Sequence, residues 1–144
     1  LLGLLVGVGL TLWLGAKVLE ATGPARTPST SEASAEPVVA IQPAVGLSGG
    51  QAVSVTASGL TPGPVRITPC VIADGGPPRC DEARTVDAEV DADGAVRAPV
   101  PVAANITVVD ATVDCASPAA PCRLLVHPPG RFEGPSAPYE LTPP

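Results

Sequence analysis

Four cysteines are the residues of this 144-residue chain whose type and spacing most clearly imply chemistry. Nine residues separate Cys70 from Cys80, and six separate Cys115 from Cys122. Structural zinc sites normally use pairs separated by two to four residues, and neither spacing fits. Of the three possible pairings we favour the two local disulfides, because both enclosed stretches contain Pro or Gly turns. Disulfides predict an oxidising, extracytoplasmic compartment.

The other chemistry-bearing patterns do not assemble a catalytic or metal site. Segment 46–50 fits the letters of the Gly-x-Ser-x-Gly nucleophile turn, but a strand pattern follows it where that motif needs a helix. The single histidine, His127, precedes two prolines and is expected to be a packed or edge residue. The acidic run from Glu89 resembles the start of a calcium loop, but its twelfth position is Val100, which has no side-chain oxygen. We therefore predict no catalytic residue, metal or cofactor, and no enzymatic activity.

Composition and charge exclude two further classes of function. Trp, Tyr and Phe occur once each, too few for an aromatic ligand cage or a stacking platform for single-stranded nucleic acid. The formal net charge of −6 repels phosphate backbones, so direct nucleic-acid binding is not expected. The hydrophobic fraction of 45% excludes wholesale disorder. With so few aromatic residues, the core must consist of Val, Ile, Leu and Ala.

The first 37 residues differ in composition from the rest of the chain. Residues 1–19 are apolar apart from a few positions, and predict either a transmembrane anchor or the hydrophobic part of a signal peptide. We favour the anchor, because bulky Leu14 occupies a position where signal peptidase needs a small residue. Residues 20–37 are rich in Pro, Ser, Thr and Ala and predict a flexible, disordered linker. The chain is thus expected to be membrane-anchored, or secreted if the first segment is cleaved.

From residue 38 onward, short segments of alternating apolar and polar residues predict β-strands. Pro, Gly and Asp turn signals separate them at a spacing of about ten residues. The candidate strands are residues 51–58, 64–70, 85–90, 105–113 and 123–126. This pattern indicates an all-β sandwich or barrel.

Five landmarks in chain order resemble the neocarzinostatin family, the secreted actinomycete apoproteins that carry enediyne antibiotics. They are the turn segment 45–51, the strand and turn 53–63, the Cys70–Cys80 spacing, the hairpin Asp91–Gly94, and Thr112-Val-Asp-Cys115 followed by Cys122. The resemblance implies an immunoglobulin-like antiparallel β-sandwich of about seven strands over residues 38–144. From the composition, we expect this sandwich to be preceded by an apolar N-terminal helix and the disordered linker.

In that family a cleft with aromatic walls and a disulfide at its floor binds the chromophore. The resemblance implies a candidate cleft between the two disulfide loops, lined by Ile72, Pro78, Thr85, Arg123, Leu125 and His127. Ile72 and Thr85 stand where the family has Trp and Phe, so the broad aromatic faces that shield an enediyne are missing.

Two functions are compatible with these observations. We expect a non-enzymatic extracytoplasmic domain that holds an apolar or amphipathic small molecule in the candidate cleft. The alternative is a cell-surface immunoglobulin-like module that contacts a protein partner and holds no small molecule. A cavity beside Ile72 would favour the first function, and a filled cleft the second.

Overall fold

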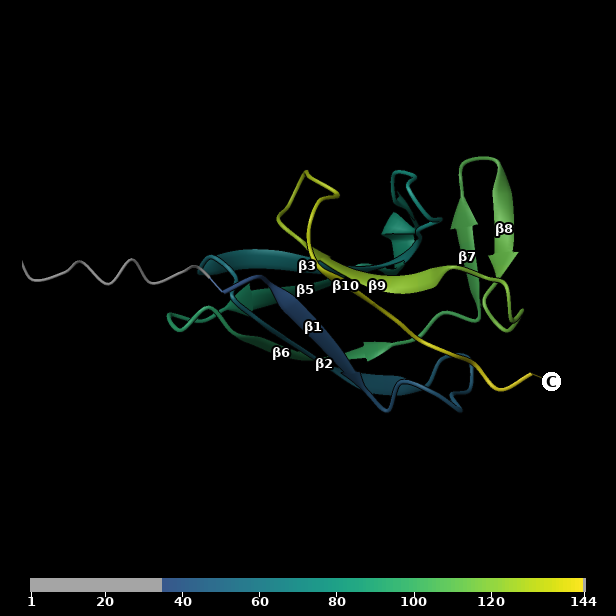
Figure 1. Ribbon diagram of the computed structural model, residues 1–144, viewed down its shortest axis with the longest axis horizontal. Helices are drawn as coiled ribbons and strands as arrows, with labels where there is room; N and C mark the ends of the chain where they lie inside the picture. The colour runs from purple at the N-terminus through teal and green to yellow at the C-terminus, as the bar shows by residue number, and fades with distance from the viewer. Residues whose placement is uncertain (1–34, 144) are drawn as a thin grey trace, which may run out of the picture. The chain divides into compact units, whose positions relative to one another are not determined.

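The computed structural model describes residues 35–143, which lie within one compact unit. These residues form an all-β, antiparallel fold, which confirms the predicted fold class (Figure 1). The strands are β1 (Val38–Gln42), β2 (Ala52–Ser58), β3 (Gly63–Val71), β4 (Arg79–Cys80), β5 (Val86–Val90), β6 (Val96–Pro101), β7 (Asn105–Val108), β8 (Ala111–Asp114), β9 (Cys122–His127) and β10 (Ser136–Pro138). A single turn of 3-10 helix, η1 (Glu82–Arg84), lies between β4 and β5.

The first layer of the sandwich is a three-stranded sheet in the order β1-β2-β6. Strands β2 and β6 bury every second residue, the pattern of a sheet with one face on the core. Val55 on β2 pairs with Ala98 on β6, and both side chains point into the core. The alternation seen in the sequence thus fixes which face of this sheet is buried.

The second layer is a five-stranded sheet centred on β3. β9 and then β10 lie along one edge of β3, while β4 and β5 both pair with its other edge. Inner-face residues such as Ile67 on β3 and Val126 on β9 are paired across the strands and fully buried. The opposite face carries Thr68, which pairs with Leu125. This second, outer face is where most of the predicted site residues lie.

Strands β7 and β8 form a separate two-stranded ribbon at one end of the sandwich (Figure 1). The prediction of one continuous strand over 105–113 is wrong, because the chain reverses at Val109 and Asp110. Two adjacent valines break the alternation there, and Asp110 suits the turn. Asp81 ties the ribbon to the sheet, since its carboxylate accepts a hydrogen bond from the Thr107 N–H at 3.2 Å.

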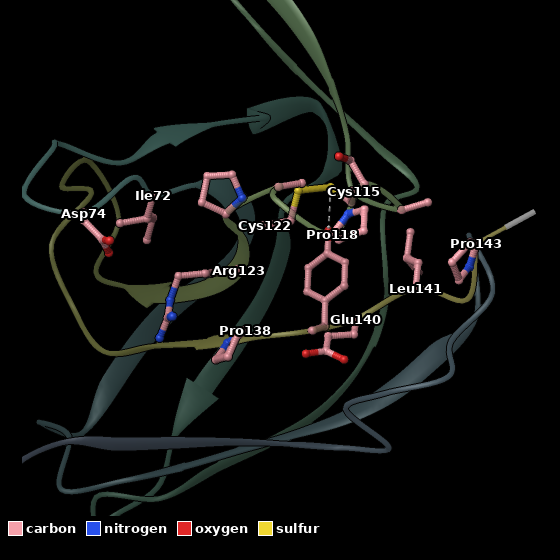
Figure 2. A pocket seen from close by; sticks show the side chains of 15 residues that line it. Ile72, Asp74, Cys115, Pro118, Cys122, Arg123, Pro138, Glu140, Leu141 and Pro143 are labelled. Carbon is pink, nitrogen blue, oxygen red and sulfur yellow. Dashed lines mark hydrogen bonds between the residues drawn. A yellow bond between two sulfur atoms is a disulfide. The ribbon is translucent and has the colours of Figure 1, made fainter.

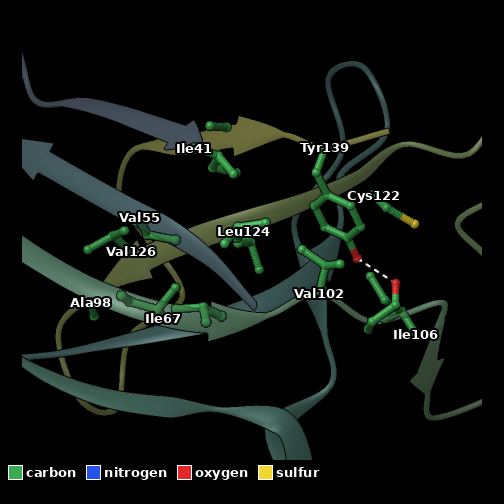
Figure 3. Packing of buried hydrophobic residues seen from close by; sticks show 14 of the residues in the cluster. Ile41, Val55, Ile67, Ala98, Val102, Ile106, Cys122, Leu124, Val126 and Tyr139 are labelled. Carbon is green, nitrogen blue, oxygen red and sulfur yellow. Dashed lines mark hydrogen bonds between the residues drawn. The ribbon is translucent and has the colours of Figure 1, made fainter. Parts of the chain in front are cut away.

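The core between the two layers is built from aliphatic side chains, as the composition predicts. Figure 3 shows Ile41 and Val55 of the first sheet facing Ile67, Leu124 and Val126 of the second. Among the buried residues that the structure describes, Tyr139 is the only Phe, Tyr or Trp side chain. Because small branched side chains bury little apolar surface each, the two disulfides are important additional sources of stability, since they constrain the unfolded chain.

The expectations for the N-terminal segments fall largely outside the described residues. The apolar segment 1–19 and linker residues 20–34 are not described, and Ala35–Pro37 are exposed residues without regular structure. Within residues 35–143, no helix is both long and apolar enough to span a bilayer.

Candidate functional site

Two disulfides close the loops at one end of the five-stranded sheet. Cys70 is bonded to Cys80 across the paired strands β3 and β4, with the Cα atoms 4.0 Å apart. Cys115 is bonded to Cys122 and closes the loop between β8 and β9, with a Cα separation of 5.7 Å. The structure thus joins the cysteines in the two local pairs that we favoured from their spacing.

The two disulfide-closed loops touch each other directly. The N–H of Ile72, just after Cys70, donates to the carbonyl of Pro121, just before Cys122, at 2.9 Å. Cys115 is held in turn by its own N–H, which donates to the carbonyl of Ala104 at 2.8 Å. Loops that are covalently closed and mutually hydrogen-bonded lose little further freedom when a ligand binds between them.

A cavity of about 430 Å³, which we call the interloop cleft, lies where these loops meet (Figure 2). Three segments form its walls: the first loop, the second loop with its disulfide, and the C-terminal segment that crosses below them. The lining residues are Ile72, Asp74, Cys115–Pro118, Ala120–Arg123, Pro138–Leu141 and Pro143. Apolar side chains such as Ile72 and Leu141 alternate with polar and charged ones, so the cleft offers apolar and polar contact in similar measure.

The C-terminal wall of the cleft is fixed by backbone hydrogen bonds to the segment before β2. Glu140 N–H donates to Ala44 at 2.8 Å, and Thr142 N–H donates to Leu47 at 2.8 Å. Leu47 and Leu141 also form an isolated parallel bridge, and both are buried. This wall therefore belongs to the folded body rather than to a loose tail.

Tyr139 anchors the same wall from inside. Its side chain is 4% exposed, and its hydroxyl donates to the carbonyl of Ala103 at 3.0 Å and lies 3.5 Å from Sγ of Cys115 (Figure 3). Burial raises the pKa of Tyr139 to about 12, because the ionised phenolate would lose its hydration. Tyr139 thereby links the C-terminal wall to the segment before β7 and to the second disulfide.

Charged groups of both signs lie at the cleft. Arg123 is held by Ser136, whose side-chain and backbone oxygens accept hydrogen bonds from Nε and Nη2 at 2.8 and 3.0 Å. Asp74 and Glu140 contribute carboxylates, and Figure 2 shows Arg123 and Glu140 on either side of Pro138. The cleft can therefore take a molecule with an apolar body and a polar substituent.

The structure divides the six residues of the candidate cleft among three places. Ile72 and Arg123 line the interloop cleft. Pro78 lines a smaller cavity of about 220 Å³, the outer recess, together with Arg79, Cys80, Glu82, Val108–Asp110 and Phe132. Leu125 and His127 are each 2% exposed on the outer face, and Thr85 beside them is half-buried. His127 also lines a third cavity of about 360 Å³, together with Val126, Pro128 and Glu133–Pro135.

A chain of hydrogen bonds joins Thr85, Thr68 and His127 on this face. Thr85 Oγ1 and Thr68 Oγ1 are 2.9 Å apart, Thr68 Oγ1 and His127 Nε2 are 2.9 Å apart, and His127 Nδ1 lies 3.0 Å from the Pro128 carbonyl. A carbonyl only accepts, so Nδ1 carries the proton, and in the neutral imidazole Thr68 donates to Nε2. This hydroxyl–imidazole pair cannot meet a substrate, because Thr68 is 0% exposed.

Sequence reasoning missed three residues of this region: Thr68, Phe132 and Tyr139. The Phe132 ring packs on the imidazole of His127, with the ring centres 4.8 Å apart and the planes at 42°. Phe132 and Tyr139 are the only Phe and Tyr of the chain, and this scarcity of aromatic residues is the sequence feature that could have identified them. Within residues 35–143, no cluster of His, Cys, Asp or Glu is arranged to hold a metal ion.

Comparison with known proteins gives a consistent result. Macromomycin from Streptomyces macromomyceticus is 39% identical over 74 residues, which are 51% of each chain, so this chain spans about half the length of that curated relative. The solved structure of macromomycin has a TM-score of 0.61 at 31% identity, covering 74% of this chain and 99% of that one. Apokedarcidin has a TM-score of 0.53 at 27% identity, with the same coverage. The model of the neocarzinostatin family matches residues 39–137, and the chain belongs to that family.

Proposed function

We propose that this protein is a non-enzymatic, extracytoplasmic small-molecule-binding protein whose ligand occupies the interloop cleft. The observation that carries the proposal is the cavity of about 430 Å³ between two disulfide-closed loops, directly beside Ile72. Small-molecule sites commonly measure about 300–1,000 Å³ and are largely pre-formed. Membership of the neocarzinostatin family supports a binding role over a catalytic one.

The rigidity of the walls supports binding without rearrangement. Both loops are covalently closed, the Ile72–Pro121 hydrogen bond joins them, and the C-terminal wall is bonded to Ala44 and Leu47. A ligand that enters pre-ordered walls avoids the entropy cost of ordering them. The cleft is therefore suited to bind a molecule without rearranging its walls.

The chemistry of the lining defines the class of ligand. Ile72, Pro118, Pro121 and Leu141 offer apolar contact, while the guanidinium of Arg123 can donate to an acceptor. The carboxylates of Asp74 and Glu140 disfavour a strongly anionic molecule. We propose an amphipathic ligand with an apolar body and one neutral or weakly acidic acceptor group. An enediyne of the kind that family members carry is a less suitable ligand, because Tyr139 is the only aromatic side chain among residues 35–143 that lines the cleft.

The proposed location is extracytoplasmic, since two disulfides persist only in an oxidising compartment. We propose that residues 1–19 either anchor the protein in the membrane or are cleaved so that it is secreted. Membrane fractionation of the native protein distinguishes these two outcomes. Resistance of the full chain to alkaline extraction would indicate an anchor, and recovery of a soluble form that begins after residue 16 would indicate a signal peptide.

Native mass spectrometry of the protein purified from its own host tests the proposed site. We expect a co-purifying small molecule on the wild-type chain and its loss from the Ser117→Trp variant, because Ser117 is an exposed residue that lines the cleft. Thr112→Trp is the matched control, since Thr112 is also exposed but does not line the cleft. A wild-type protein without any bound molecule, or a Ser117→Trp variant that keeps it, would contradict the proposal and favour the protein-interaction alternative.

A further inference from the structure

The third cavity, the one of about 360 Å³ that His127 lines, lies at the other end of strands β3 and β9 from the disulfides; we call it the proline groove. β3 begins in the groove at Gly63 and runs to Cys70, while β9 begins at Cys122 and ends in the groove at His127. Its walls are the loop between β2 and β3, the loop between β9 and β10, and Pro37 from the chain before β1. The proline groove and the interloop cleft share no described residue, so they are separate cavities.

Both loops that form the groove are held in defined paths. In the first loop, the Leu60 N–H donates to the carbonyl of Gly94 at 3.0 Å. At the base of the second loop, the Val126 N–H donates to the carbonyl of Pro135 at 3.0 Å, and a Cβ atom at Gly134 would overlap the carbonyl oxygen of Val126. The walls are therefore ordered before any ligand arrives, which lowers the entropy cost of binding.

The lining of the groove is mainly aliphatic. Prolines contribute five of the lining residues, and their rings offer apolar contact without a backbone N–H. They are Pro37, Pro62, Pro64, Pro128 and Pro135. His127 has no free ring nitrogen to offer, because Thr68 and the Pro128 carbonyl engage both. Among the described residues that line the groove, Glu133 is the only carboxylate, and no Lys or Arg accompanies it.

The charges around the groove are mainly negative. Neither of the ion pairs formed among the described residues involves Glu133, which is exposed. Glu36 precedes the wall residue Pro37, and Asp93 lies on the hairpin whose Gly94 carbonyl binds Leu60; both acids are exposed. Arg131 is on the same loop as Glu133 but does not line the groove. Charge complementarity therefore favours a cation over a neutral or anionic molecule.

We propose that the proline groove is a second ligand site, which binds an organic cation with an aliphatic body, such as a primary alkylamine. The aliphatic body packs on the proline rings, and the ammonium group donates to the carboxylate of Glu133. The volume of about 360 Å³ lies within the range of roughly 300–1,000 Å³ that small-molecule sites occupy. This site is independent of the interloop cleft and of the molecule proposed to bind there.

Three probes with the same alkyl chain test the proposal: hexylamine, hexanol and hexanoate, which are cationic, neutral and anionic at neutral pH. Each is titrated into the full chain at constant pH and low salt, and proton NMR follows the imidazole of His127, the only histidine of the chain. We expect hexylamine to bind about two- to fivefold more tightly than hexanol, the effect of one exposed ion pair, and hexanoate to bind most weakly. Added salt should reduce the advantage of hexylamine because it screens exposed charges.

Two substitutions locate the site. Glu133→Gln should weaken hexylamine binding about two- to fivefold and leave hexanol binding unchanged. Glu82→Gln is its matched control, since Glu82 is also exposed but does not line the groove. Thr61→Trp should weaken hexylamine binding at least about tenfold, because Thr61 is an exposed lining residue. Thr112→Trp, at an exposed position outside the groove, should have no effect.

The proposal is overturned if hexylamine gives no saturable shift of the His127 protons, or if hexanoate binds as tightly as hexylamine. It is also overturned if Glu133→Gln keeps the full preference for hexylamine over hexanol. Should Thr61→Trp fail to fold, the nearly isosteric Glu133→Gln decides the question alone. Ser117→Trp obstructs the interloop cleft and should leave the hexylamine titration unchanged, so this inference and the proposed function fail separately.

Discussion

The hydroxyl of Tyr139 offers a sharp test of how the wall of the interloop cleft is held. Tyr139→Phe removes one oxygen atom and keeps the aromatic ring in the core. The carbonyl of Ala103 then loses the hydrogen bond that it accepts at 3.0 Å in a buried position. A buried polar group left without its partner costs about 1–3 kcal/mol. We expect a loss of about 1–2 kcal/mol of folding free energy, or about 4–10 °C in Tm for a domain of this size.

The same hydroxyl makes stability depend on pH at the alkaline end. The folded pKa of about 12 lies above the ordinary value of 10.0, so the folded state binds the phenolic proton more tightly than the unfolded state does. The resulting stabilisation is fully present below pH 10 and is lost as the pH rises toward 12. At about 1.4 kcal/mol for each unit of pKa, this loss amounts to about 2–3 kcal/mol. The Phe variant lacks this loss, so its deficit in stability should close as the pH rises above 10 and should reverse as the pH approaches 12.

Urea denaturation followed by circular dichroism at neutral pH, and again between pH 10 and 12 with brief exposure, measures both effects. Tyr139 is the only tyrosine of the chain, so absorbance at 295 nm follows its ionisation as a single curve. Thr112→Val is the control for removal of a hydroxyl from an exposed position, and it should change stability by less than about 0.5 kcal/mol. An unchanged midpoint in Tyr139→Phe, or a tyrosine that titrates near pH 10 in the folded protein, would refute this account.

Two further substitutions test the packing. Leu124→Ala should cost about 2–5 kcal/mol in urea denaturation because Leu124 is fully buried between the sheets, whereas Val109→Ala at the exposed tip of the ribbon should change stability by less than about 0.5 kcal/mol. Gly134→Ala should cost about 1–3 kcal/mol because its Cβ meets the Val126 carbonyl, whereas Gly76→Ala, whose Cβ would meet nothing closer than 3.6 Å, should be close to neutral. Equal effects within either pair would contradict the packing described.

The parts of the fold that follow local rules could be predicted from the sequence. Strict alternation over 51–58 predicted β2, because a half-buried strand repeats every two residues. The same rule failed over 105–113, where β-branched residues continue through a turn and conceal the separation of β7 from β8. Strands β1 and β10 lacked a clear pattern, because each is short and lies at a sheet edge.

The candidate site was predictable only where residues are adjacent to a cysteine. Ile72 and Arg123 each lie within two residues of a disulfide-bonded cysteine, and both line the interloop cleft. The contribution of Phe132 was not predictable, because it depends on a long loop folding back onto His127. Tertiary packing decides which cavity a side chain lines, and no local sequence pattern predicts this choice.

The bridge between Leu47 and Leu141 also bears on the order of folding events. The two residues are far apart in the sequence, so their contact closes a long loop and carries a large entropic cost. Contacts of this kind slow folding and usually form after local hairpins such as β7–β8. Since the bridge completes one wall of the interloop cleft, we expect the cleft to take its final shape late in refolding, after most secondary structure has formed.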